Sequence, residues 1–248
     1  MNTRLFKQIF YGSIFLVIII GIISIFYFSF RAKPSCFDGK QNQGEEGIDC
    51  GGPCAQICFP QDFRNIEVLW TKLLPTDKRL ILIAKIQNPN AELGVYDFDY
   101  EFSISKNNQV LKTVNGKSYI YAQEVKYIVE FIDKENIDLN SSLNLSLKNI
   151  SWTKAEKFKK PNIILLDKKY LSDKDFNHII GKIKNNDFVL LKNIKIIANV
   201  YNENNLILSS VNTINQLDVG ETKSFDIVFP LSVNLDSAQT EIVIEAKK

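Results

Sequence analysis

The sequence predicts a mainly β protein with an N-terminal transmembrane helix, a short disulfide-rich module and two tandem antiparallel β-sandwiches. Three observations carry this prediction: an uncharged apolar segment near the start, four cysteines in one short stretch after it, and a remainder that repeats itself. The chain has 248 residues, of which 45% are hydrophobic and 23% are charged. This balance is typical of folded proteins, and the length allows more than one domain.

The apolar segment covers residues 9–30, from Ile9 to Phe30, and contains no charged residue. As a helix rising about 1.5 Å per residue it would be roughly 33 Å long, enough to cross the hydrocarbon core of a bilayer. A cleaved signal peptide is the alternative. Against it, Phe30 is bulky where a cleavage site needs a small residue, and the apolar run is longer than a usual signal core. We therefore expect a retained membrane anchor that contacts lipid.

Charges around the anchor orient it only weakly, since Arg4 and Lys7 precede it and Arg31 and Lys33 follow it. The cysteines give a stronger indication, because clustered cysteines just outside a membrane are typical of an oxidising compartment. We expect residues 1–8 in the cytoplasm and the chain from residue 31 onward outside it. The prediction is a single-pass protein of the cell membrane.

Residues 31–60 form the predicted cysteine-rich module, which has too few aliphatic residues to build a core. Its four cysteines are Cys36, Cys50, Cys54 and Cys58. Two disulfides would restrain it by reducing the entropy of the unfolded chain, and the sequence leaves all three pairings open. A zinc site is one alternative, but it needs thiolates in a reducing compartment and a different spacing. A redox pair is another, but nothing basic lies beside these cysteines to activate a thiolate.

Oxygen-bearing side chains alternate with glycines in the same module. Those that could ligate a cation are Asp38, Asn42, Glu45 and Asp49. Oxygen ligands on a glycine-rich turn suit a hard cation such as calcium, although the spacing is not that of an EF-hand. The alternative is a solvated acidic turn.

The module resembles a motif of about CxDGxxNxxExGxDCGGxCxxC that recurs in surface proteins of many bacteria. The residues from Cys36 to Cys54 fit this motif, whereas Cys58 follows Cys54 after three residues and not two. The resemblance implies a surface location and no particular activity.

The rest of the chain contains two copies of one domain, at an offset of 97 residues that takes Lys85 to Lys182. The segments around these lysines read IAKIQN and IGKIKN, and the same offset aligns Glu124 with Glu221. A period of this length is too long for a solenoid repeat and suits a complete small β domain. We expect one sandwich at residues 61–160 and another at residues 161–248.

Both copies show the alternation of apolar and polar residues that buries one face of a strand. The alternating apolar positions are Phe98, Tyr100, Phe102 and Ile104 in copy one, and Ile194, Ile196, Ala198 and Val200 in copy two. Asparagine pairs at 107–108 and 204–205 predict hairpin turns. A short helix is expected over residues 172–178, before the central strand of copy two.

Longer segments carry a resemblance to known domains. Copy two reads GKIKN at 181–185, IKIIANVYN at 194–202 and LDVGETK at 217–223, and copy one reads IQNPN at 86–90 and YDFDYEF at 96–102. These segments resemble the FxLYD-like and late-embryogenesis-abundant (water-stress) domains, although ANVYN replaces FxLYD. The resemblance implies immunoglobulin-like sandwiches in a membrane-anchored envelope protein, as in uncharacterised proteins of candidate-phyla bacteria, and it provides no catalytic residues.

The residues outside the module do not indicate catalysis. His178 is the single histidine, so sites that need two imidazoles are excluded, and the usual hydrolase and nucleotide-binding motifs do not occur. Asp97, Asp99 and Glu101 alternate along one strand and are expected on its solvated face.

A small basic cluster lies in the connector between the copies. Lys157, Lys159 and Lys160 are expected to be solvated, with contact to an anionic envelope polymer as the alternative.

These features predict a non-enzymatic, membrane-anchored cell-surface protein that binds or scaffolds other envelope proteins or polymers. Sheet edges and end loops are the expected contact surfaces. One alternative is an accessory or assembly factor of an envelope, secretion or pilus complex. A second is a thiol-redox or metal-dependent protein that uses the cysteine module. The net charge of +2 argues against nucleic acid as a partner, and no small-molecule substrate is indicated.

Overall fold

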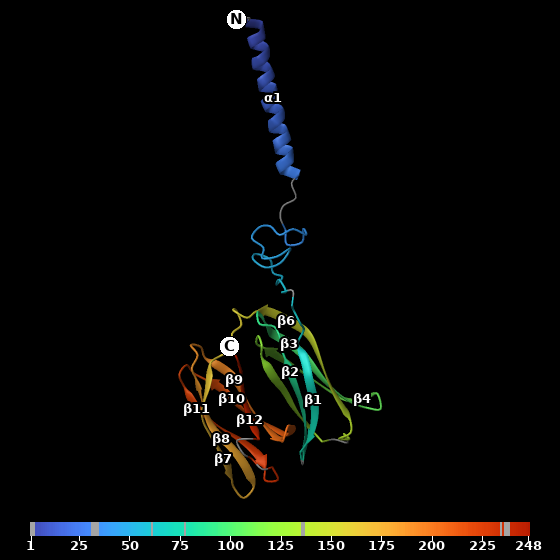
Figure 1. Ribbon diagram of the computed structural model, residues 1–248, viewed down its shortest axis with the longest axis vertical. Coiled ribbons are helices and arrows are strands. Elements are labelled where there is room, and N and C mark those ends of the chain that lie inside the picture. The colour runs from blue at the N-terminus through green and yellow to red at the C-terminus, as the bar shows by residue number, and fades with distance from the viewer. Residues whose placement is uncertain are drawn as a thin grey trace. The chain divides into compact units, whose positions relative to one another are not determined.

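One helix and twelve strands account for most of the residues that the structure describes (Figure 1). The computed structural model describes residues 3–30, 35–60, 62–76, 78–134, 137–233, 235 and 239–248. The chain divides into two compact units, Met1–Phe59 and Pro60–Lys248. The first unit holds the helix and the cysteine module, and the second holds every strand.

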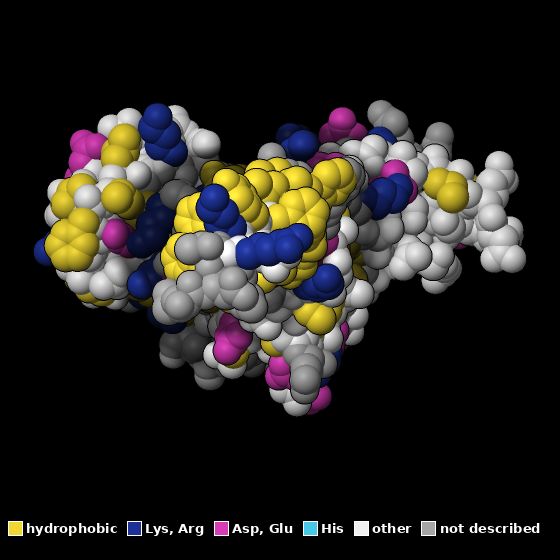
Figure 2. Space-filling model, turned by 90° about the horizontal axis from the view of Figure 1, so that it is seen from above, with side chains coloured by type: hydrophobic (Ala, Val, Ile, Leu, Met, Phe, Trp, Pro, Cys, Tyr) yellow, Lys and Arg dark blue, Asp and Glu magenta, His cyan; other side chains and the backbone are white. Residues whose placement is uncertain are grey.

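Helix α1 spans Thr3–Phe30 and begins six residues before the predicted anchor. Its stretch Phe6–Phe28 is long and apolar enough to cross a membrane, and none of its most apolar part is buried by the rest of the chain. Hydrophobic side chains gather over this helix when it is seen from above in Figure 2. A signal sequence has the same properties. Arg31 and Lys33, which entered the orientation prediction, lie outside the described residues.

Six strands form the first sandwich. They are β1 (Glu67–Pro75), β2 (Arg79–Gln87), β3 (Leu93–Lys106), β4 (Gln109–Ile120), β5 (Val125–Asp133) and β6 (Ser142–Lys154). They pair antiparallel in two sheets of order β1-β2-β5 and β4-β3-β6. Phe98, Phe102 and Ile104 of β3 are buried between the sheets, as their alternation predicted.

The second sandwich repeats the first strand by strand. Its strands are β7 (Ile163–Ser172), β8 (Phe176–Asn185), β9 (Leu191–Asn202), β10 (Asn205–Leu217), β11 (Thr222–Pro230) and β12 (Thr240–Lys247). The sheets have the orders β11-β8-β7 and β10-β9-β12, which are those of the first sandwich with each strand moved six places along the chain. The mainly β fold with two sandwiches is thus confirmed.

A buried asparagine explains why the two copies share one sequence signature. Asn88 and Asn185 are both fully buried. The side-chain amide of Asn88 donates hydrogen bonds to the carbonyls of Leu93 and Tyr121, and that of Asn185 donates to the carbonyls of Val189 and Leu217. Each asparagine therefore ties the loop that follows it to the end of another strand.

Strand β2 is buried on both faces, which accounts for its unbroken apolar run. Leu80 and Leu82 face the core of the first sandwich. Ile81 and Ile83 point the other way and belong to a cluster that includes Ile197 and the core of the second sandwich. A strand with only one buried face would alternate apolar and polar residues. The continuous apolar sequence of β2 is therefore explained by packing between the two sandwiches.

Two local predictions need correction. The helix expected over residues 172–178 is wrong: Ser172 ends β7, residues 176–178 begin β8, and residues 173–175 form a tight turn between them. A carboxylate oxygen of Asp173 accepts hydrogen bonds from the backbone N–H groups of Asp175 and Phe176. The hairpin turn predicted at 204–205 lies one residue earlier, with Glu203 at a positive φ of 53°, because β10 already begins at Asn205. The turn at Asn107 and Asn108 is confirmed, and both have positive φ.

Candidate functional site

The four cysteines of the module form two disulfides. Cys36 pairs with Cys54, and Cys50 pairs with Cys58. This choice among the three pairings could not come from the sequence, because it depends on which turns bring the chain back on itself. The two bonds close overlapping loops in a segment that has almost no hydrophobic core.

Asp38 and Asp49 use their carboxylates to hold the module's backbone. Asp49 accepts hydrogen bonds from the N–H groups of Asp38 and Gly39 at 2.9–3.1 Å. Asp38 accepts from the N–H groups of Ser35 and Lys40 and from the side chain of Asn42. The bond from Asn42, followed by the backbone bonds, lowers the pKa of the Asp38 carboxyl below its usual value.

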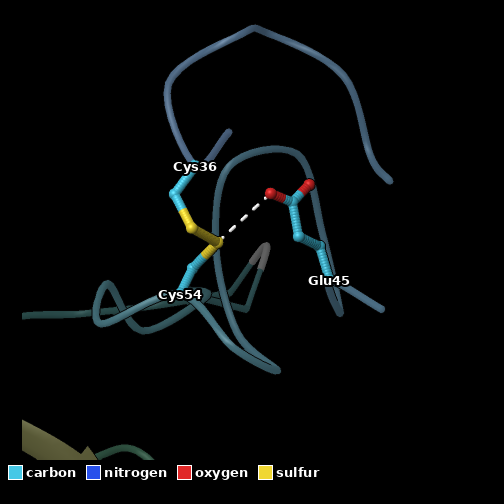
Figure 3. A group of neighbouring side chains, drawn as sticks. All are labelled: Cys36, Glu45 and Cys54. Atoms are coloured by element: carbon cyan, nitrogen blue, oxygen red, sulfur yellow. Dashed lines mark hydrogen bonds between the residues drawn. A yellow bond between two sulfur atoms is a disulfide. The ribbon is translucent and has the colours of Figure 1, made fainter. Parts of the chain in front are cut away.

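Glu45 is the buried acid of the module, with 7% of its surface exposed. One carboxylate oxygen accepts a hydrogen bond from the N–H of Asn42. The other lies 3.1 Å from the sulfur of Cys54, the contact drawn in Figure 3. A disulfide sulfur carries no hydrogen, so Cys54 cannot donate there. Cys36, Glu45 and Cys54 have potential ligand atoms within 4.8 Å of one another, but both sulfurs are spent in the disulfide and are not thiolates.

The carboxylate oxygens predicted to bind calcium therefore already accept hydrogen bonds from the protein itself. Asp38, Glu45 and Asp49 each accept backbone N–H groups, whereas Oδ1 of Asn42 is buried without a hydrogen-bond partner among the described residues. A cation here would have to compete with these N–H donors for the carboxylate oxygens. Calcium binding stays a prediction.

His178 lies on an outer sheet face between two carboxylates. Its ring nitrogens are 3.0 Å from oxygens of Asp173 and Asp226, and 20% of its side chain is exposed. The hydrogen bond to Asp226, and then the bond to Asp173, raises the pKa of the imidazole above its usual value of 6.5. A histidine held between two acids favours the charged form, which is unsuited to act as a general base.

The alternating acids of β3 lie on the outer face of their sheet, as expected. Asp99 pairs with Lys117 at 3.3 Å and Glu101 pairs with Lys148 at 3.6 Å. A hydrogen bond from Asn149, and then one from Lys117, lowers the pKa of Asp99. These acids are partners of surface lysines on neighbouring strands.

The seam between the two sandwiches holds a buried ion pair that sequence reasoning missed. Nζ of Lys126 on β5 lies 2.9 Å from a carboxylate oxygen of Glu245 on β12, and the side chains are 3% and 6% exposed. The same Nζ lies 3.7 Å from the ring centre of Tyr119, a cation–π contact. The repeat aligned Lys126 with Lys223, which is a surface residue, so no sequence signal pointed to burial.

A second polar group in the seam joins three side chains. The hydroxyls of Tyr127 and Tyr201 lie 3.1 Å apart, and both reach the same carboxylate oxygen of Glu241, at 2.8 and 2.9 Å. Burial, followed by the contacts with Tyr201 and Glu241, raises the pKa of Tyr127. Tyr127 comes from the first sandwich and the other two from the second, so the seam combines polar and apolar contacts.

The connector between the sandwiches, residues 155–162, has one buried aromatic residue with exposed lysines on either side of it. Phe158 is buried, with its ring stacked 4.4 Å from that of Tyr121. Lys160 pairs with Glu124 at 2.7 Å. Lys157 and Lys159 are exposed and form no ion pair with any described residue.

Two comparisons with known proteins found no match. No protein-family model matches the chain, and no significantly similar sequence was found among curated proteins.

Proposed function

We propose that the protein is a non-enzymatic, single-pass membrane protein of the cell surface, which binds or scaffolds other envelope proteins or polymers. The observation that carries the proposal is helix α1, whose apolar side chains lie outward along its length. Ile9 is 63% exposed and Phe28 is 71% exposed, for example. A helix that is apolar on all faces and not covered by the rest of its chain is stabilised by lipid, because exposing so much apolar surface to water is unfavourable.

The two disulfides support an extracytoplasmic location for the chain beyond the helix. Structural disulfides persist in oxidising compartments and are rare in the cytosol. Both bonds lie after α1, which ends at Phe30, and Cys36 is the first of the four cysteines. This supports a cytoplasmic N-terminus and an external C-terminal region.

The sandwich pair supports a scaffolding role over a catalytic one. The seam joins the two sandwiches through a shared apolar cluster and through the Lys126–Glu245 pair. Two domains joined in this way present their loops at fixed relative positions, which suits the display of a binding surface. All four cysteines are paired, which supports a structural use of the module.

Membrane fractionation of the full chain tests the anchor. We expect the wild-type chain to stay in the membrane after alkaline carbonate extraction, with its N-terminal residues still present by mass spectrometry. The variant Val17→Arg/Ile18→Arg should be extracted, because two charges at the centre of the apolar stretch are costly in lipid. Val17→Leu/Ile18→Leu is the matched control and should stay. A mature chain that begins after residue 30 would instead identify a signal peptide.

Affinity capture of the solubilised full chain tests the binding role. We expect the wild-type chain to retain envelope proteins or polymers. Recovery of the chain alone, under conditions that keep the disulfides formed, would contradict the proposal.

A further inference from the structure

We propose that an exposed apolar tip at one end of the Pro60–Lys248 unit inserts into the lipid surface, as a membrane contact additional to α1. The apolar tip consists of Phe188, Val189 and Leu190 in the loop between β8 and β9, and Val219 in the turn between β10 and β11. The inference rests on the proposed function, because it requires the unit to be tethered to a membrane.

The tip exposes more apolar surface than a loop of a soluble domain needs to. Phe188 is 92% exposed, Val219 56%, Val189 42% and Leu190 41%. Large apolar side chains gathered on an exposed loop mark an interaction site, because leaving them in water is unfavourable. Phe188 alone offers a whole aromatic ring to a partner.

Hydrogen bonds hold the backbone at the base of the tip. The buried side chain of Asn185 bonds the carbonyls of Val189 and Leu217, and the N–H of Gly220 donates to the carbonyl of Asn185. Asp187 accepts hydrogen bonds from the N–H of Phe188 and from Lys248. The loop and the turn are thus held together, with their apolar side chains pointing outward.

The first sandwich shows that the fold does not require an apolar tip. Its buried Asn88 also donates to two backbone carbonyls, those of Leu93 and Tyr121, each one position away from the match of the carbonyls that Asn185 binds. At the offset of 97 residues, Ala91 matches Phe188, Ala122 matches Val219 and Glu92 matches Val189. Leucine is kept at the fourth position, but Leu93 is buried where Leu190 is 41% exposed. Two copies with one scaffold therefore differ in the side chains that would enter lipid, which argues for a role specific to the second copy.

The tip lies at the end of the Pro60–Lys248 unit where the chain enters it. Asn90 binds the backbone of Arg64, which places the entry of the chain beside the loop after β2. The connector reaches the tip itself, because the N–H of Asn186 donates to the carbonyl of Asn162. Because the chain that enters this end of the unit carries the proposed membrane anchor, we take lipid as the occupant of the tip.

The connector that contacts the tip through Asn162 also carries two exposed cations. Lys157 and Lys159 are exposed cations of the same connector without an ion-pair partner among the described residues. Glu156 lies next to them, and Asp187 and Asp218 directly precede Phe188 and Val219 in the tip itself, so the charges offset one another. We therefore expect the apolar side chains to carry the contact.

Depth-dependent fluorescence quenching in proteoliposomes tests the proposal on the full chain. The reporter is Leu190→Cys, labelled with an environment-sensitive fluorophore while the disulfides are intact, and the vesicles contain nitroxide-labelled lipid with or without anionic lipid. We expect a blue shift and strong quenching. The reporter Ser232→Cys, in the loop after β11 at the other end of the sandwich, should show neither.

The variant Phe188→Ala/Val219→Ala gives the matched comparison, because it installs the residues that the first sandwich already tolerates. Quenching of the residue-190 reporter should fall to the level of the Ser232 reporter. If quenching persists unchanged, or if the blue shift occurs without lipid quenching and so reports burial in protein, the proposal is overturned. Carbonate extraction of the same samples measures anchoring by α1 separately. A chain that has lost its anchor is thereby distinguished from an anchored chain whose tip does not insert into lipid.

Discussion

At the scale of single residues, the seam between the sandwiches depends on one buried charge pair. Lys126 and Glu245 have lost nearly all contact with water, and one oxygen of Glu245 has no hydrogen-bond partner among the described residues. Such a pair is weak evidence of net stability, since desolvation offsets the attraction between the charges. Removing one partner is a different matter, because the other charge is then buried alone.

Lys126→Met should therefore lower the free energy of unfolding by about 3–5 kcal/mol. Urea unfolding in detergent micelles, followed by tryptophan fluorescence, measures this. The control Lys148→Met removes a largely exposed partner of Glu101 and should cost less than about 1 kcal/mol. The double variant Lys126→Met/Glu245→Met should recover most of the loss. A single variant as stable as wild type would show that the pair is not buried in solution.

The buried asparagines give a second prediction at this scale. Asn185→Ala leaves the carbonyls of Val189 and Leu217 without their donor, so we expect a loss of about 1–3 kcal/mol. Asn88→Ala should cost a similar amount in the first sandwich. Asn186→Ala, next along the chain and exposed, is the control and should be nearly neutral. Unequal effects of the two buried sites would mean that the repeats are not energetically equivalent.

At the scale of elements, strand β8 illustrates how a neighbouring strand constrains a residue. Gly181 pairs with Phe225 across the sheet, and a Cβ at Gly181 would lie 2.6 Å from the Phe225 ring and 2.5 Å from the carbonyl oxygen of Asp167. Gly181→Ala should therefore destabilise the second sandwich by about 1–3 kcal/mol through overpacking. Lys182→Ala, at the next and exposed position, is the control. Thermal melting of both variants checks the difference.

His178, on the outer face of the same sheet, should have a measurably raised pKa. Because Asp226 and Asp173 raise the pKa of His178, its charged form stabilises the fold below the unfolded pKa, and this contribution is lost as pH rises through the folded pKa. NMR titration of the single histidine should give a pKa above 6.5. Asp226→Asn should lower that pKa more than Asp173→Asn. An unshifted value in the wild-type chain would contradict the contacts.

At the scale of the whole molecule, the two compact units should respond differently to reductant. Thiol counting on the native chain should find no free cysteine, and reduction should release Cys36, Cys50, Cys54 and Cys58. Hydrogen exchange in residues 35–59 should then rise, because this segment has almost no hydrophobic core and its carboxylate-to-backbone hydrogen bonds depend on the loops that the disulfides close. The strands of Pro60–Lys248 form a separate unit and should keep their protection. Loss of protection in the strands would mean that the module supports the sandwiches.

Much of the architecture was accessible from the sequence because its signals are local and periodic. Alternation in β3, the apolar run of α1 and the offset between the copies each depend on residues close in sequence or on self-comparison. The turn after β7 was predicted as a helix because a run without glycine or proline gives no strong break signal. Its Asp173 side chain makes the turn by hydrogen bonding its own backbone.

The sequence by itself determined the order of parts: an apolar helix, a cysteine module and a β domain present twice. Only the tertiary structure decided the disulfide pairing, the burial of Lys126 against Glu245 and the exposure of Phe188. The physical reason is the same in all three cases. Each property depends on which distant segment lies beside the residue, and burial or exposure of a lysine or a phenylalanine is set by that neighbour. Strand β2 illustrates both contributions. Its apolar composition was visible in the sequence, but only the tertiary structure shows that its second face is buried against the other sandwich.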